Sequence, residues 1–340
     1  MDHTELRKAI ACMPKTELHL HIEGTLEAPL ALQLASRNNV SLPWNTLEEL
    51  EKQYDFSNLQ SFLDLYYILM GTLKTQEDFA DLMFAYLQRA HENGIRHAEI
   101  FFDPQVHMNN HIPFSTVIKG LLNGLDLGKQ AFGITGGLIL CIIRDMPVES
   151  AEAVLKEAEP YAKDLIGIGL DSAEVGYPPE LFEAVYRKAR QLGLHCVAHA
   201  GEEGPADYVK QALDVLHVER IDHGIHAYDD PELVQRLAQE QIPLTSCPLS
   251  NKRLKVVNDI RELPLHEMLQ AGLRVCINSD DPAYFGGYLV DNYMALLENG
   301  YSLEECATFA RNSIEACFIS REEKDTLLAD FDKWYEQYVK

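Results

Sequence analysis

Short apolar runs and longer helical stretches alternate along the whole chain. Eight runs rich in β-branched and aliphatic residues each end in polar residues, which is the pattern of a buried strand. They cover residues 16–23, 95–103, 136–144, 165–171, 194–201, 220–223, 242–246 and 273–280. Between them lie stretches with helical periodicity, such as residues 179–192, 230–240 and 263–271, and the last two precede Gln-Ile-Pro and Gly as helix stops.

This alternation predicts an α/β fold with a parallel sheet, and eight is the number of strands that closes a (β/α)8 TIM barrel. A doubly wound open sheet is the alternative, because short strands are easily miscounted. We expect residues 1–340 to form a single domain, with two extra helices in 59–93 between the first two strands and a helical tail from Ser302. The aromatic face of the extra helices (Phe62, Tyr66, Tyr67) could cover the mouth of the barrel, although simple core packing explains it equally well.

The composition of the chain limits the classes of molecule that it could bind. The chain carries 53 acidic and 29 basic residues, a net charge of −24, so it repels phosphate backbones and anionic membrane surfaces. No apolar run reaches the roughly 20 residues that span a bilayer, and the N-terminus has no apolar signal region. Seven scattered cysteines without a CxxC pair read as reduced residues. These features predict a cytoplasmic protein without nucleic-acid or membrane partners, and leave a small substrate open.

The first run holds His19 and His21, which share a face because alternate strand residues point the same way. Two such imidazoles can converge on one divalent ion, but an HxH pattern alone is a weak signal. The fifth run ends near His199, with Glu202 three residues on; the sixth ends at His223, and the eighth ends at Asp280. In a barrel, these strand ends surround one mouth. A polar residue that simply caps a strand explains any single one of these four strand ends, but it is a poor explanation for all four together.

Three histidines and one aspartate suit Zn²⁺ with one position open for water, which then ionises near pH 7. Glu202 and His223 fit the acid and the orienting group that such a reaction needs. A two-metal site bridged by a carboxylated lysine needs a lysine at a strand end, and the fourth run offers none, so we expect one ion. Phosphate-binding loops, a GxSxG elbow, an HExxH helix and the HxE…PCxxC signature are absent. Cys247 is expected to be structural, and the remaining histidines are expected in surface or loop positions (His97, His107, His111, His217, His266).

Five motifs, ELHLHIEGTL, HAGEEG, RIDHGI, SCPLSN and NSDDP, in this order, resemble the adenosine/adenine deaminase family of metal-dependent barrel hydrolases. The resemblance runs from about Pro14 to Ser313. It implies a single metal-dependent hydrolase domain with one zinc ion per chain, attack of hydroxide on purine C6, and loss of ammonia. By this resemblance Glu202 protonates N1, His223 orients the hydroxide and Asp281 hydrogen-bonds N7. The zinc ligands it implies are His19, His21, His199 and Asp280.

Two departures bear on the substrate. Glu23 stands where adenosine deaminases carry an aspartate that contacts the ribose. Glu174, in DSAEVG, stands where a glycine of their LAGDE-like segment is expected, so its carboxylate could accept the N9–H of a free base and crowd a ribose. With FFDPQ and CPLSN, this pattern looks like the bacterial adenine deaminase branch, which implies hydrolysis of adenine to hypoxanthine and ammonia in purine metabolism or salvage.

Other readings stay open at this point. The substrate could be adenosine, converted to inosine, or an N6-substituted adenine. The chain could be an amidohydrolase acting on another ring. A catalytically inactive purine-binding protein would usually lack a ligand or the acid, and here all seven candidate positions are filled. The expected partner is a small purine base without phosphate, and a homo-oligomer is among the possible states.

Overall fold

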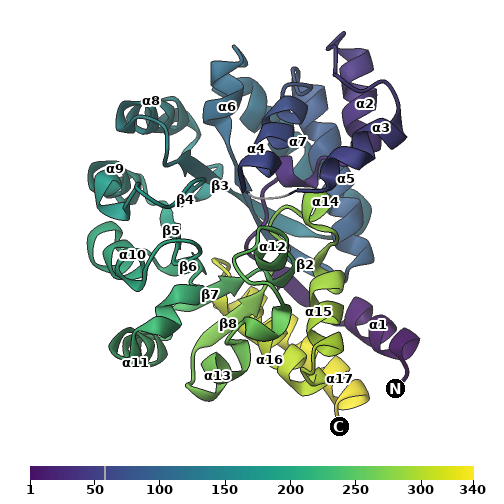
Figure 1. Cartoon of the computed structure of the whole chain (residues 1–340), viewed down its shortest axis with the longest axis vertical. Coiled ribbons are helices and arrows are strands. Elements are labelled where there is room, and N and C mark those ends of the chain that lie inside the picture. The colour runs from purple at the N-terminus through teal and green to yellow at the C-terminus, as the bar shows by residue number, and fades with distance from the viewer. Residues whose placement is uncertain (57–58) are drawn as a thin grey trace.

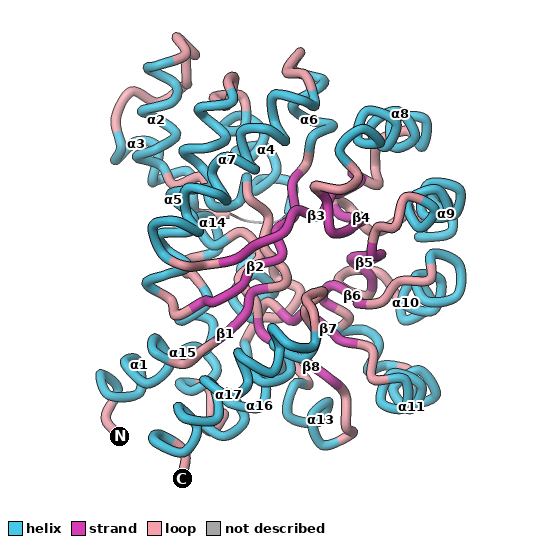
Figure 2. The backbone as a smooth tube through the Cα atoms, turned by 180° about the vertical axis from the view of Figure 1, so that it is seen from behind, coloured by secondary structure: helices cyan, strands magenta, loops and turns pink. Residues whose placement is uncertain are grey.

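Eight parallel strands form one sheet in the order β1 to β8, with neighbours in the sequence paired throughout. The computed structural model describes residues 1–56 and 59–340. The strands lie at the centre of the molecule and the helices surround them (Figures 1 and 2). The predicted TIM barrel is therefore confirmed, and the open sheet is excluded. The strands are β1 Lys15–Glu17, β2 Ile95–Phe102, β3 Thr135–Ile143, β4 Leu165–Asp171, β5 His195–Ala200, β6 Arg220–His223, β7 Pro243–Ser246 and β8 Arg274–Ile277.

The first strand is shorter than predicted, and this shortening closes the barrel. Regular pairing with β2 ends at Glu17, and the chain beyond it bonds in turn to both neighbours. Asp280 N donates to His19 O at 3.1 Å, His21 N donates to Asp280 O at 3.0 Å, and Ile22 N donates to Phe101 O at 2.9 Å. Because residues 19–22 bond to Asp280 on one side and to Phe101 on the other, they cannot continue the regular strand pairing with β2. The chain then turns into a 3-10 helix, η1 (Glu23–Thr25), where the sequence predicts strand to residue 23.

The helices form the outer layer, and the predicted ones are present with small shifts. Residues 179–192 fold as a short 3-10 helix (Pro179–Phe182) followed by α9, and Asp230 caps α11 by accepting from Glu232 N and Leu233 N. The helical tail is α16 and α17, and Trp334 Nε1 donates to Ala9 O, which ties the two ends of the chain together. The α-helices are α1 His3–Cys12, α2 Ala28–Arg37, α3 Leu47–Glu51, α4 Leu59–Met70, α5 Gln76–Glu92, α6 Pro104–Asn109, α7 Phe114–Phe132, α8 Val148–Ala158, α9 Glu183–Gln191, α10 Ala206–Gln211, α11 Pro231–Glu240, α12 Pro248–Arg253, α13 Leu265–Gln270, α14 Pro282–Phe285, α15 Leu289–Glu298, α16 Leu303–Ala316 and α17 Arg321–Tyr338.

The insertion between β1 and β2 is larger than expected. The two helices predicted in 59–93 are α4 and α5, but α2 and α3 precede them. All seven cysteines are free, and every one except Cys12 is buried, in line with the reduced state that the sequence predicts. Within the described part of the chain, no helix combines the length and the apolar character that crossing a membrane requires.

Helices α5 and α7 pack closely because one face of α7 carries glycines at every fourth position: Gly120, Gly124 and Gly128. A Cβ on Gly124 would lie 2.5 Å from Met83 Cβ and 2.7 Å from Ala80 O, both on α5. The missing side chains therefore set the distance between the two helices.

Replacing Gly124 by valine should lower the free energy of unfolding by about 1–3 kcal/mol, the usual cost of overpacking, because the added atoms push α5 away. Urea unfolding followed by circular dichroism measures this. Asn123→Val is the matched control, since Asn123 is the exposed preceding residue of the same helix. Equal stability of the two variants would contradict the packing argument.

A buried ion pair joins the barrel wall to the C-terminal segment. Arg220 on β6 donates to Glu99 Oε2 on β2 at 2.5 Å and to Leu18 O at 3.0 Å, and the Arg220 and Glu99 side chains are both fully buried. The second oxygen of Glu99 accepts from Phe318 N, and the Arg220 guanidinium lies over the Phe318 ring at 4.8 Å. The Arg220–Glu99 pair thus links β2 and β6 to each other, to Leu18 and to Phe318, which are far apart in the sequence.

Candidate active site

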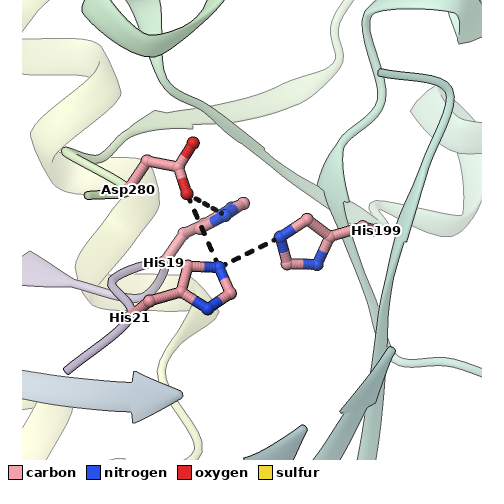
Figure 3. A group of neighbouring side chains, drawn as sticks. All are labelled: His19, His21, His199 and Asp280. Atoms are coloured by element: carbon pink, nitrogen blue, oxygen red, sulfur yellow. Dashed lines mark hydrogen bonds and ion pairs between the residues drawn. The ribbon is translucent and has the colours of Figure 1, made fainter. Parts of the chain in front are cut away.

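Four buried side chains from three barrel segments face one point at the mouth: His19, His21, His199 and Asp280 (Figure 3). Their potential ligand atoms all lie within 4.8 Å of one another. His21 Nε2 is 3.2 Å from His199 Nε2, and Asp280 Oδ1 is 3.3 Å from His19 Nε2 and 3.5 Å from His21 Nε2. The structure brings together all four residues that the sequence nominated as metal ligands.

Polar groups around the cluster orient His19 and His21 so that an unprotonated ring nitrogen of each faces the centre of the cluster. Thr245 donates its hydroxyl proton to Asp222 Oδ1 at 3.0 Å, so its oxygen accepts from His19 Nδ1 at 2.8 Å. This arrangement keeps the proton of His19 on Nδ1 and leaves Nε2, a buried atom that none of the described residues hydrogen-bonds, facing the cluster. His21 Nδ1 lies 3.5 Å from Asp171 Oδ2 in the same way. Such outer contacts orient histidine ligands in metal sites.

Burial favours the neutral forms of His199 and His223, which lie near an ionised Asp280. Burial, and then the nearby His19, lower the pKa of His199 well below its usual range and that of His223 to about 3. Burial alone would raise the pKa of Asp280, but its interactions with the surrounding imidazoles, that of His19 first, outweigh burial and hold that pKa well below the usual range. Unprotonated nitrogens and one anionic oxygen are the donor set of a divalent cation such as zinc, so these residues fit a metal ion.

Glu202 and His223 lie beside this cluster. Glu202 follows β5, and its Oε2 is 3.4 Å from His223 Nε2, which is itself 3.9 Å from Asp280 Oδ2. Burial, and then the charge of Asp280, raise the pKa of Glu202 well above its usual range. Glu202 therefore keeps its proton to a higher pH than an ordinary carboxyl group does. It lines the same cavity as His21, His199, His223 and Asp280, which makes it a candidate proton donor.

Three residues at this mouth have left-handed backbone conformations. Ser172 after β4 has φ 71°, and His223 at the end of β6 and Asp280 after β8 each have φ 64°. Such angles are uncommon for residues other than glycine and cluster at functional sites. They turn the chain away from the barrel at once, so that the side chains face the cavity.

Helix α4 forms one wall of the cavity. Phe62, Tyr66 and Tyr67 line it, as the lid hypothesis expects. Phe62 and Tyr66 also pack against Tyr284, with ring centroids 5.5 Å apart in each case, so they belong to the core as well.

Asp281 lines the cavity as the resemblance implies, and its Oδ1 accepts no hydrogen bond from the residues described. Gly24 lies directly against it, and a Cβ at that position would overlap the Asp281 carboxylate. Glu23, expected to contact substrate, does not line the cavity. Its Oε1 is held by His107 Nε2 at 2.9 Å and by Asp103 N at 3.2 Å, so it supports the wall from behind.

Glu174, which the sequence predicts to contact the substrate, binds backbone amides in the structure. Its Oε1 accepts from Gly201 N at 2.7 Å, and its Oε2 accepts from three further amides, those of Glu202, Glu203 and Gly204, at 2.9–3.0 Å. It does not line the cavity. Ser172, in the same segment, does line the cavity. Its backbone has a left-handed conformation, which glycine adopts more readily than other residues do. Glu174 instead fixes the loop that carries Glu202.

Sequence reasoning missed the two further acidic residues that line the cavity, Asp103 and Asp171. They end the second and fourth predicted runs, so the strand-end signal that identified the histidines could have found them. Of the other histidines, His97 and His107 are buried rather than at the surface, while His111, His217 and His266 are exposed as expected. Cys247 is buried before α12 and does not line the cavity, in line with a structural role.

Comparison with known proteins agrees with this site. Residues 14–334 match the family model described as adenosine deaminase. The chain is 53% identical to an adenine deaminase of Streptomyces coelicolor, over 93% of both chains. It superposes with a TM-score of 0.93 on the crystal structure of an adenine deaminase from Arthrobacter aurescens (51% identity, 95% of this chain and 99% of that one). An amidohydrolase from Burkhoderia ambifaria, solved with bound Zn, matches with a TM-score of 0.89 (28% identity, 97% and 94% coverage). The chain belongs to the adenosine deaminase family.

Proposed function

We propose that this enzyme is a zinc-dependent adenine deaminase that hydrolyses adenine at C6 to hypoxanthine and ammonia. The observation that carries the proposal is Glu202, a carboxyl group with a raised pKa that lines the cavity beside the His/Asp cluster. The names of relatives about half identical over nearly the whole chain support the choice of adenine. The proposal includes one hydrolase domain over residues 1–340, one ion per chain, a purine base as partner and a cytoplasmic role in purine metabolism.

Zinc is proposed because three imidazoles and one carboxylate match its preferred donors. The residues that would hold it are His19, His21, His199 and Asp280. When bound, zinc supplies a Lewis acid that lets a water lose a proton near neutral pH. The related amidohydrolase solved with Zn supports this identity.

The residues of the chain carry the proton movements. Glu202 donates its proton to N1 of the purine, which prevents negative charge from building on the ring as C6 is attacked. His223 is neutral because its pKa is about 3, so its Nε2 can accept a hydrogen bond from the attacking water and orient it. Burial and the neighbouring Asp280 raise the pKa of Asp281, so its carboxyl can donate to N7.

The test is deamination of adenine and adenosine by the purified, zinc-loaded chain, followed by ultraviolet absorbance. We expect a higher kcat/KM for adenine, loss of activity on chelation and recovery with zinc. Higher kcat/KM for adenosine, or for an N6-substituted adenine, would overturn the choice of substrate. Full activity after complete removal of metal would overturn the metal dependence.

Glu174 should affect rate rather than substrate choice. In a Glu174→Gln variant one oxygen becomes an amide that faces N–H donors, so the Glu202 loop shifts and kcat falls by up to about 10²-fold, the loss that a misplacement of about 1 Å produces. The ratio of kcat/KM for adenine and adenosine should not change. Glu203→Gln, on the exposed neighbouring side chain, is the control. A shift of preference toward adenosine would restore Glu174 as a substrate contact.

A further inference from the structure

One wall of the cavity is acidic, and no residue in it has yet been given a contact with the substrate. Asp103 follows β2 and Asp171 ends β4, and both line the cavity together with Ser172 and Tyr67. The two aspartates are 5% and 3% exposed. Neither belongs to the His19–His21–His199–Asp280 cluster, although Asp171 Oδ2 lies 3.5 Å from the outer nitrogen of His21.

One oxygen of each of these two carboxyl groups lacks a hydrogen-bond donor. The Oδ1 atoms of Asp103 and Asp171 are buried, and neither accepts a hydrogen bond from the residues that the structure describes. No arginine or lysine lines the cavity to neutralise them. A buried acceptor without a donor is costly, so such atoms usually meet a partner when the site is filled.

The wall is also held in place. Glu23 Oε1 accepts from the backbone N–H of Asp103 and from His107, which fixes the chain at the end of β2. At the end of β4, Asp171 O accepts from Arg144 N at 3.1 Å. Two fixed acceptors beside the apolar side chains of Phe62 and Leu63 suit a flat, neutral ring that presents an N–H group.

We infer that Asp103 and Asp171 form a subsite that accepts the N9–H of a free purine base. The inference rests on the proposed function, because C6 must lie at the metal cluster. N9 then lies on the edge of the base that faces away from C6. A free base carries a proton there, whereas a nucleoside carries a sugar, so this subsite selects bases over nucleosides.

The test compares adenine with 9-methyladenine, which lacks the N9–H. Asp103 is the residue to change, because Asp171 also contacts His21. In the zinc-loaded enzyme, Asp103→Leu should lower kcat/KM for adenine by about 10- to 100-fold, the loss expected when a buried N–H donor is left without its acceptor. The value for 9-methyladenine should change little, so the preference for adenine should collapse. Asp103→Ser, which shortens the side chain, should do the same and serves if the leucine variant does not fold.

Asp145→Asn is the control, since it removes one exposed aspartate close to the same mouth and should keep the wild-type preference. A folded Asp103 variant with the wild-type ratio of the two substrates would overturn the inference. So would a second metal ion in the wild type that is lost in Asp103→Leu, because His21, Asp103, Cys141 and Asp171 also lie within ligand distance of one another. Failure of the wild type to deaminate adenine would instead overturn the proposed function itself.

Discussion

Replacing Glu202 by glutamine should lower kcat for adenine by about 10²- to 10⁴-fold, the range that a positioned general acid contributes. Glutamine has nearly the same size, and its amide cannot give up a proton to N1. The effect should fall on kcat rather than KM, because proton donation acts in the transition state. Steady-state kinetics together with the zinc content of both proteins measure this, and the zinc content should be unchanged.

The pH dependence gives an independent check on the same residue. Burial raises the pKa of Glu202, so the acid keeps its proton to a higher pH than an ordinary carboxyl group, and activity declines when the pH exceeds this raised value. The alkaline limb of kcat/KM should therefore report Glu202. Glu203→Gln, on the next and more exposed carboxylate, should keep both the rate and the profile. A Glu202→Gln rate within tenfold of the wild type would show that another group donates the proton.

The largest effect on stability should come from Glu99. Replacing it by alanine leaves Arg220 buried without its counter-charge, and breaking a buried pair in this way costs about 3–5 kcal/mol. That loss is a large part of the roughly 5–15 kcal/mol that holds a typical domain folded. Urea unfolding of the purified variant measures it. A double replacement, Glu99→Leu with Arg220→Met, removes both charges and should recover most of the stability.

The same pair predicts an acid limb of the stability profile. Burial alone would raise the pKa of Glu99, but Arg220 outweighs it and lowers the pKa from 4.5 to about 2. Because the folded value is the lower one, the contribution of this group is fully present above pH 4.5 and is lost as the pH falls toward 2. Glu99→Gln should flatten that part of the curve. A loss below about 1 kcal/mol in Glu99→Ala would contradict the role of the pair.

The barrel and its metal-type cluster could be predicted because both follow from a repeated local signal. Each unit places a short apolar run before polar residues, and parallel strands bring those ends to one mouth. This placed His199, His223 and Asp280 correctly from the sequence. It applies equally to Asp103 and Asp171, whose strands end in the same way.

The roles of Glu23 and Glu174 could not be predicted, because they depend on which groups meet across the fold. Glu174 lies 27 residues before the first amide that it binds, Gly201, and nothing local marks that pairing. The early end of the first strand has a similar cause. His21 and Ile22 bond to different neighbours, Asp280 and Phe101, and that choice is made only when the barrel closes.

The left-handed residues at the mouth set a limit on engineering this enzyme. Glycine at Ser172, His223 or Asp280 would relieve backbone strain of order 1–3 kcal/mol at each position. At His223 and Asp280, the same change removes an imidazole or a carboxylate from the site. Stability and catalysis therefore favour different residues at these two strand ends. Selection for heat resistance should accumulate substitutions elsewhere in the barrel.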